Sequence, residues 1–163
     1  MKTILALVDH SDVTPKVLDE THRLARAFGG RVILLHVTPE TVIAEYGPVP
    51  LSAEERRTEQ QKLFALRDAL AARGTSATAQ QAEGNVVDTI LVKCRQLAPD
   101  LIIMGSHGHG ALYNLLVGSV TAGVLKRATC PVMVVPGNAE AREEPAADTT
   151  EEQELEDAGF AHD

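Results

Sequence analysis

The sequence contains no tryptophan, and three phenylalanines and two tyrosines are its only other large aromatic residues. Proteins that bind single-stranded nucleic acid stack bases on aromatic side chains and neutralise phosphates with clustered lysine and arginine. Lysine and arginine together number 15 among 163 residues, and no basic patch stands out along the sequence. We therefore expect no nucleic-acid partner.

Cysteine is scarce, and long apolar runs are absent. Cys94 and Cys130 fit neither a metal-binding spacing nor a disulfide framework. We interpret both as small buried apolar residues rather than reactive thiols. No run is long enough to cross a membrane, and the start is apolar only from Ile4 to Val8, unlike a signal peptide. These features predict a cytoplasmic protein without membrane insertion.

The formal net charge of −8 is concentrated at one end of the chain. Residues 138–163 carry ten acidic side chains and one basic side chain, whereas residues 1–137 carry thirteen acidic and fourteen basic ones. This difference predicts one near-neutral folded domain over 1–137 and an acidic, disordered tail over 138–163. The tail either improves solubility or docks on an unknown protein partner.

Short apolar runs alternate with longer segments of helical periodicity. The predicted strands are residues 2–8, 31–37, 75–82, 100–105 and 131–136. The predicted helices begin at Thr14-Pro15, at the Ser52–Glu55 capping box, at Asn85 and at Ser119. This alternation predicts an α/β fold, in which right-handed crossovers place helices on both faces of a parallel sheet.

Such sheets bind ligands at the carboxyl ends of the strands, where the strand order reverses. The stretch MGSHGHGALYNLLVGS, residues 104–119, leaves the fourth strand there and contains four of the twelve glycines. Glycine lets backbone N–H groups approach a ligand closely, and a helix start adds unpaired N–H donors. Gly105 and Gly108 are expected to bend the chain around a phosphate, and residues 118–121 to present amides and hydroxyls to it. The alternative is a compact connection without a ligand.

The loop fits neither of two general phosphate-binding motifs. No lysine follows its second glycine, as a Walker A motif requires, and its glycines lack the spacing and position of a dinucleotide fingerprint. Instead the pattern resembles the nucleotide-binding branch of the universal stress protein family, with Gly, two residues, Gly, nine residues, then Gly-Ser or Gly-Thr. Gly105, Gly108, Gly118 and Ser119 match this pattern without a gap.

The resemblance extends to ILALVDHSD, VILLHV and CPVMVVP, and so covers residues 1–137. It implies a three-layer fold whose five-stranded parallel sheet has the order 3-2-1-4-5, with helices on both faces. It also implies an ATP site at the switch point, with a Mg or Mn ion on the triphosphate and no dedicated protein cage for that ion. ADP and a cyclic nucleotide present the same phosphate and stay open as alternatives.

Matched positions imply the roles of individual residues. Asp9 would contact the ribose, and Val37 would meet adenine through its backbone, with Leu7 and Met104 nearby. The residues implied to surround the phosphates are Gly105, Gly108, His109, Gly110, Gly118, Ser119, Val120 and Thr121. The chain departs from the common pattern at His10, where many members of the family have glycine.

Two of these positions have alternative interpretations. Asp9 could instead cap the helix that follows it. His107 and His109 could form a metal pair with His10 or His36, but this spacing lacks a third committed ligand. We therefore predict no protein metal site and no catalytic residue.

The strand at 131–136 is apolar on both faces and is expected to form a sheet edge, which proteins usually cover. Either the tail covers it or, as the resemblance implies, a homodimer forms through it. The loop at 38–51 is a candidate lid over the adenine end.

The favoured hypothesis is an ATP-binding stress-response regulator whose nucleotide occupancy modulates its dimer or partner state. One alternative is a slow ATPase or phosphotransferase, although no arginine finger or Walker lysine is evident. Another is an interaction module without nucleotide.

Overall fold

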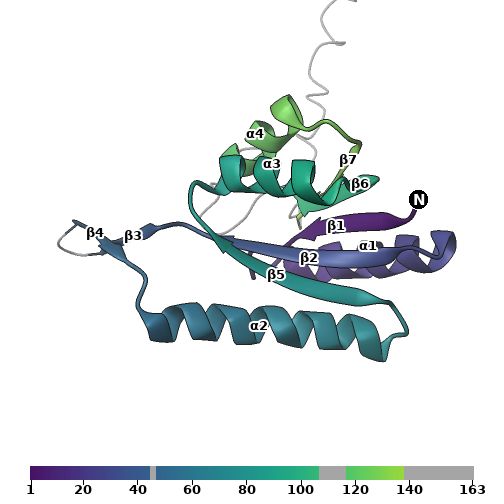
Figure 1. Ribbon diagram of the computed structural model, residues 1–163, viewed down its shortest axis with the longest axis horizontal. Helices are drawn as coiled ribbons and strands as arrows, with labels where there is room; N and C mark the ends of the chain where they lie inside the picture. The colour runs from purple at the N-terminus through teal and green to yellow at the C-terminus, as the bar shows by residue number, and fades with distance from the viewer. Residues whose placement is uncertain (45–46, 107–116, 138–163) are drawn as a thin grey trace, which may run out of the picture.

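The computed structural model describes residues 1–44, 47–106 and 117–137. Their elements alternate along the chain as the sequence predicts, with one additional hairpin (Figure 1). The elements are β1 (Thr3–Leu7), α1 (Thr14–Phe28), β2 (Arg31–Thr38), β3 (Thr41–Ala44), β4 (Gly47–Pro50), α2 (Ala53–Ala72), β5 (Ala77–Glu83), α3 (Val86–Leu97), β6 (Leu101–Gly105), α4 (Ser119–Arg127) and β7 (Val132–Val135).

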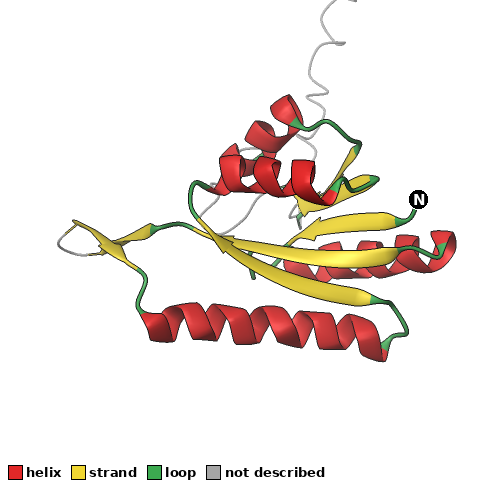
Figure 2. Cartoon of the chain, in the orientation of Figure 1, coloured by secondary structure: helices red, strands yellow, loops and turns green. Residues whose placement is uncertain are grey.

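The main sheet has five parallel strands in the order β5-β2-β1-β6-β7. Numbered along the chain without the hairpin, these strands have the predicted order 3-2-1-4-5. Helices α1 and α2 pack on one face of the sheet and α3 and α4 on the other (Figure 2). The predicted three-layer α/β fold is confirmed.

Side chains of the central strand β1 alternate between two apolar cores. Ile4 and Ala6 are fully buried in the core beneath α1 and α2, whereas Leu5 and Leu7 face the core beneath α3 and α4. A strand buried on both faces favours apolar side chains, which explains the apolar run from Ile4 to Val8.

Helix ends follow the local signals in the sequence. Gly29 ends α1 in a left-handed conformation, with a φ of 62°. The predicted capping box is formed, because Glu55 N–H donates to the Ser52 hydroxyl at 3.1 Å and Ser52 N–H donates to the Glu55 carboxylate at 2.7 Å. Asn85 caps α3 by accepting from Asp88 N–H at 3.1 Å. Thr14 is the first residue of α1 and not its cap, which is Val13.

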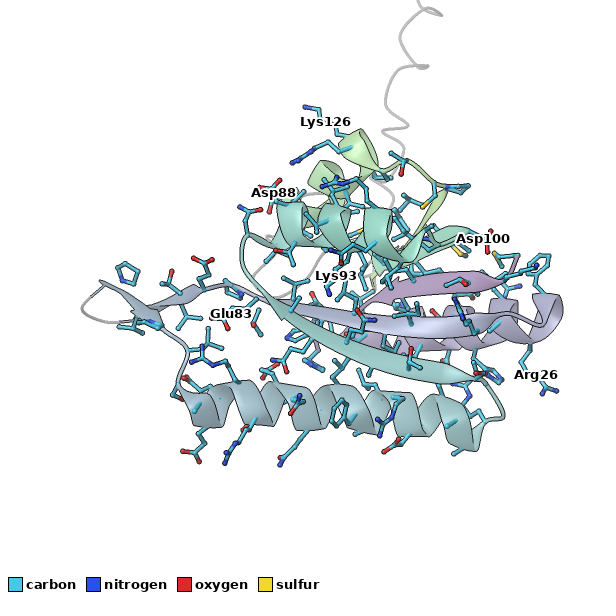
Figure 3. All side chains as sticks on the ribbon, in the orientation of Figure 1. Arg26, Glu83, Asp88, Lys93, Asp100 and Lys126 are labelled. Atoms are coloured by element: carbon cyan, nitrogen blue, oxygen red, sulfur yellow. The ribbon has the colours of Figure 1, made fainter. Side chains whose placement is uncertain are left out.

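Helix α2 is fixed to the sheet mainly by burial. Leu63 and Leu70 are almost completely buried against the strands. At its N-terminal end, Arg56 lies 3.1 Å from the carboxylate of Glu83. Figure 3 labels Glu83 at the carboxyl end of β5. This exposed ion pair contributes about 0–1 kcal/mol, much less than each buried leucine. The position of α2 is therefore set by its apolar face.

The segment 38–51 differs from the predicted loop. It contains the antiparallel pair β3–β4, in which Val42 lies opposite Val49, and this hairpin extends beyond the end of the main sheet (Figure 1). Pro48 and Pro50 favoured a loop in the sequence, but proline is compatible with a strand that has a free edge.

Within the three described ranges, no helix combines the length and the apolar character needed to span a membrane. The acidic tail, 138–163, lies outside the described residues, so its disorder and the domain boundary remain predictions.

Cys94 is buried in the core beneath α3, and Cys130 is half-buried. Burial raises the pKa of the Cys94 thiol to about 11, so roughly one thiol in a thousand is ionised at pH 8. We expect iodoacetamide at pH 8 to alkylate Cys94 far more slowly in the folded protein than in urea, as measured by mass spectrometry. Equal rates in both states would contradict its interpretation as a buried apolar residue.

Candidate functional site

A cavity of about 850 Å³ opens at the carboxyl ends of β1, β2 and β6. The starts of α1 and α4, together with α2 and α3, contribute its other walls. The cavity thus lies at the predicted switch point, where the chain leaves β1 toward one face of the sheet and leaves β6 toward the other.

The start of α4 presents backbone donors at this cavity. The first hydrogen bond within the helix runs from Ala122 N–H to Gly118 C=O at 2.9 Å. The amides of Ser119, Val120 and Thr121 therefore precede the helical hydrogen bonds, and all three residues line the cavity. Together with the helix dipole, about half a positive charge, these amides can bind an anion.

One detail of this segment differs from expectation. Gly105 is the last residue of β6, in register with Val135, so the chain does not bend there. Gly118 has ordinary extended backbone angles. The Thr121 hydroxyl donates to the Gly105 carbonyl at 2.9 Å, and so fixes the start of α4 to the end of β6.

The cavity also has an apolar wall. Leu7, Val37 and Met104 line it and belong to the core beneath α3 and α4. Val86 and Ile90 of α3 line the same cavity. Apolar side chains combined with a few polar donors in one cavity are the usual arrangement of a site for a ring system with a polar substituent.

Asp9 lies at the end of β1, is exposed, and lines the cavity. Its Oδ1 accepts hydrogen bonds from the Ser11 N–H at 3.1 Å and from the Ser11 hydroxyl at 2.6 Å. It does not cap α1, whose N-cap residue is Val13. Asp9 therefore stabilises the β1–α1 turn.

Four of the residues singled out in the sequence, Gly108, His109, Gly110 and His107, lie outside the described residues. Their roles remain predictions. The other predicted site residues, from Leu7 to Thr121, all line one cavity.

A cluster of His10, His36 and Glu59 also lines the cavity. The Glu59 Oε2 lies 3.5 Å from the His10 Nε2 and 3.4 Å from the His36 Nε2. In the sequence His10 and His36 are candidate ligands only together with the loop histidines, and Glu59 was not predicted. The pattern of α2 carries no signal for Glu59, because carboxylates and bases alternate along most of that helix.

His10 has a φ of 61°, in the left-handed region where glycine is favoured. Burial lowers the pKa of His10 below its usual value of 6.5, and nearby His36 lowers it further. Burial alone would raise the pKa of Glu59, but the Lys62 ammonium, 2.8 Å from its Oε1, brings the net shift below the usual range. At neutral pH the cluster therefore combines a neutral His10 with an ionised Glu59.

The comparisons with known proteins identify one family. A profile described as the universal stress protein family matches residues 1–136. Universal stress protein YxiE of Bacillus subtilis is 30% identical over 144 aligned residues, covering 81% of this chain and 97% of YxiE.

Two solved structures have the same fold. The universal stress protein of Archaeoglobus fulgidus in complex with dAMP superposes with a TM-score of 0.64 at 19% identity, covering 82% of this chain and 97% of that chain. A universal stress protein family protein of Arabidopsis thaliana with AMP bound superposes with a TM-score of 0.60 at 22% identity, covering 90% and 99%.

The left-handed backbone at His10 predicts an unusual order of stability among variants. Glycine adopts this conformation without the roughly 1–2 kcal/mol cost that a Cβ imposes. We expect His10→Gly to be more stable than His10→Ala by about that amount in urea denaturation. In helix α2 the order should reverse, so that Gln61→Gly is less stable than Gln61→Ala by about 1 kcal/mol. A His10→Ala variant as stable as His10→Gly would contradict the assigned conformation.

Proposed function

The chain belongs to the universal stress protein family, and on this basis we propose that it binds an adenine nucleotide in the cavity at the carboxyl ends of β1, β2 and β6. The observation that carries the proposal is the pairing of two unlike walls in one cavity. The amides of Ser119, Val120 and Thr121 form one wall, and the apolar side chains of Leu7 and Met104 belong to the other.

Each wall suits one part of a nucleotide. Hydrogen bonds from backbone amides to a charged phosphate contribute about 1.5–3 kcal/mol each. The apolar wall accepts a purine ring, and the Val37 backbone at the end of β2 is available for its polar edge. The relatives from Archaeoglobus and Arabidopsis carry dAMP and AMP, which supports adenine nucleotides as the ligand class. ATP with a Mg or Mn ion on its phosphates is the form that we propose here.

The proposed role is regulatory rather than catalytic. The sequence predicts no catalytic residue, and the Oδ1 of Asp9, the carboxylate at the end of β1, already accepts two hydrogen bonds from Ser11. Any hydrolysis of ATP is therefore expected to be slow.

Hydrogen bonds of Ser106 connect the proposed nucleotide cavity to the edge of the sheet. The Ser106 carbonyl accepts from Gly118 N–H at 2.7 Å, and its N–H donates to the Val135 carbonyl at 2.8 Å. Its hydroxyl accepts from Gly137 N–H at 3.1 Å. One residue thus connects the phosphate-binding start of α4 to the end of β7, through which the proposed twofold dimer forms.

The nucleotide proposal predicts different losses of affinity for two variants. Ser119→Ala removes one hydroxyl donor and should weaken AMP and ATP binding about tenfold. Gly105→Val should weaken binding far more, because its side chain blocks close approach of the backbone, while valine remains compatible with a strand. Isothermal titration calorimetry with AMP, and with ATP and magnesium, measures both losses.

Ser76→Ala is the matched control, because Ser76 is exposed and lies just before β5, at the opposite end of the strands. It should bind like the wild type. Protein-free extract of the denatured wild type should also contain adenine nucleotide. Unchanged affinity in both Gly105→Val and Ser119→Ala would exclude this cavity wall as the phosphate site.

The dimer proposal is tested at the outer edge of β7. Ile102 N–H donates to the Pro131 carbonyl at 3.0 Å and Ser106 N–H donates to the Val135 carbonyl at 2.8 Å. Backbone groups alternate between the two sides of a strand, so the N–H and C=O of Val134 face the open edge. Val134→Pro removes the backbone N–H that faces the open edge. Because an edge strand tolerates proline, this variant should be a folded monomer.

The wild type and a Val134→Thr control should sediment as dimers at micromolar concentration. A monomeric wild type, or a dimeric Val134→Pro variant, would refute dimerisation through this edge.

A further inference from the structure

His10, His36 and Glu59 form a cluster on the α1–α2 side of the cavity, where the nucleotide proposal assigns no contact. Their potential ligand atoms, two imidazole nitrogens and one carboxylate oxygen, all lie within 4.8 Å of one another. We propose that this cluster binds a divalent transition-metal ion of the Zn²⁺ class. The evidence comes from the orientation of each of the three side chains.

His36 directs one ring nitrogen at the cluster. Its Nδ1 lies 2.8 Å from the backbone carbonyl of Val8, and a carbonyl can only accept a hydrogen bond. The Nδ1 therefore carries a proton and donates it, so the Nε2, which lies 3.4 Å from Glu59, is the nitrogen through which this ring would bind a metal ion. A donated Nδ1–H that orients the ring is the arrangement found behind metal-binding histidines.

His10 presents a buried nitrogen without a hydrogen bond. The side chain is 10% exposed. Within the part of the chain that the structure describes, its Nε2 has no hydrogen-bond partner. Native proteins rarely leave such an atom unsatisfied, and this one is also carried on a backbone with a φ of 61°. A metal ion supplies the missing partner and accounts for a side chain at a position that favours glycine.

Glu59 presents one oxygen to both rings. Its Oε2 is 3.5 Å from the His10 Nε2 and 3.4 Å from the His36 Nε2, while its Oε1 accepts from the Lys62 ammonium at 2.8 Å. The lysine thus orients the carboxylate and leaves the second oxygen facing the imidazoles. The Lys62 ammonium thus contacts Oε1, whereas Oε2 is the oxygen that lies near both histidines.

The donor set indicates which metal ion fits. Two imidazoles and one carboxylate are a zinc ligand set that leaves a fourth position open. Imidazole selects zinc, copper, iron and nickel over magnesium and calcium. Bonds of about 2.0–2.1 Å in a tetrahedral zinc site place ligand atoms about 3.3 Å apart, close to the two measured distances to Glu59. This site therefore differs in chemistry from the Mg or Mn ion proposed on the nucleotide phosphates.

The fourth position is accessible, because all three residues line the cavity. The cluster and the apolar wall of Leu7 and Val37 lie on opposite faces of the sheet, since His36 and Val37 are successive residues of one strand. Metal binding therefore does not depend on the proposed nucleotide binding.

The test uses the full chain, freed of metal by a chelator and of nucleotide by unfolding and refolding. Zn²⁺ is titrated by calorimetry, and Co²⁺ is added separately to record the absorption spectrum of a tetrahedral site. The wild type should bind one Zn²⁺ at micromolar concentration or below. His10→Gly and Glu59→Gln should each weaken binding at least 100-fold and abolish the Co²⁺ spectrum.

Three controls separate this site from other sources of binding. His22→Asn removes a histidine whose Nδ1 instead contacts the Thr75 hydroxyl at 2.6 Å, and it should bind Zn²⁺ like the wild type. A double variant, His107→Asn with His109→Asn, should also retain binding, and so should Ser119→Ala. The proposal would be overturned if the double variant lost Zn²⁺ binding while a folded His10→Gly variant and Glu59→Gln retained it. Failure of the wild type to bind Zn²⁺ would do the same.

Discussion

The central position of β1 in the sheet is the constraint on which the site depends. In the order β5-β2-β1-β6-β7, the strands on the two sides of β1 are added in opposite directions. The chain must therefore leave β1 toward the face that α1 covers and leave β6 toward the face that α4 covers. The cavity opens at the carboxyl end of the β1–β6 pair, where these two directions diverge. Because the chain leaves β1 and β6 toward opposite faces, the starts of α1 and α4 and the side chains at the strand ends meet at this one opening.

The alternation of side chains along each strand divides this one opening into two chemical environments. Val37 belongs to the apolar core beneath α3 and α4, whereas His36, the preceding residue, faces Glu59 of α2. A shift of one residue in the register of β2 would exchange these two sides and place the His36 imidazole against the apolar wall of Leu7 and Met104. In the structure Leu34 and Leu35 are each almost fully buried against opposite layers, and the same alternation continues to His36 and Val37. The core of the sheet therefore also specifies which ligand chemistry appears on each side.

The sequence predicts most of this fold because its signals are local. The capping box at Ser52 and the cap at Asn85 act within one helical turn, and strands buried on both faces read as continuous apolar runs. The hairpin at 38–51 was missed because Pro48 and Pro50 are compatible with a strand only when one of its edges is free, which is a tertiary property. Glu59 was missed for the same reason. In the sequence it is one carboxylate among many along α2, and only packing of that helix places it beside His10 and His36. The resemblance marked His10 as a position favouring glycine, but not the reason, which is its left-handed backbone.

Ser106 limits what kind of regulation the fold can support. A ligand shifts an equilibrium only by the difference between its affinities for the two states. For nucleotide to favour a dimer, its phosphate must therefore bind more tightly when β7 is paired than when it is free. Ser106 connects the two segments that such a dependence requires, because its N–H and hydroxyl bond to Val135 and Gly137 while its carbonyl accepts from Gly118 N–H. In the proposed dimer, pairing of β7 and binding of a phosphate at the start of α4 would therefore act on the same residue. The three side chains of the proposed metal cluster come instead from β2, α2 and the β1–α1 turn.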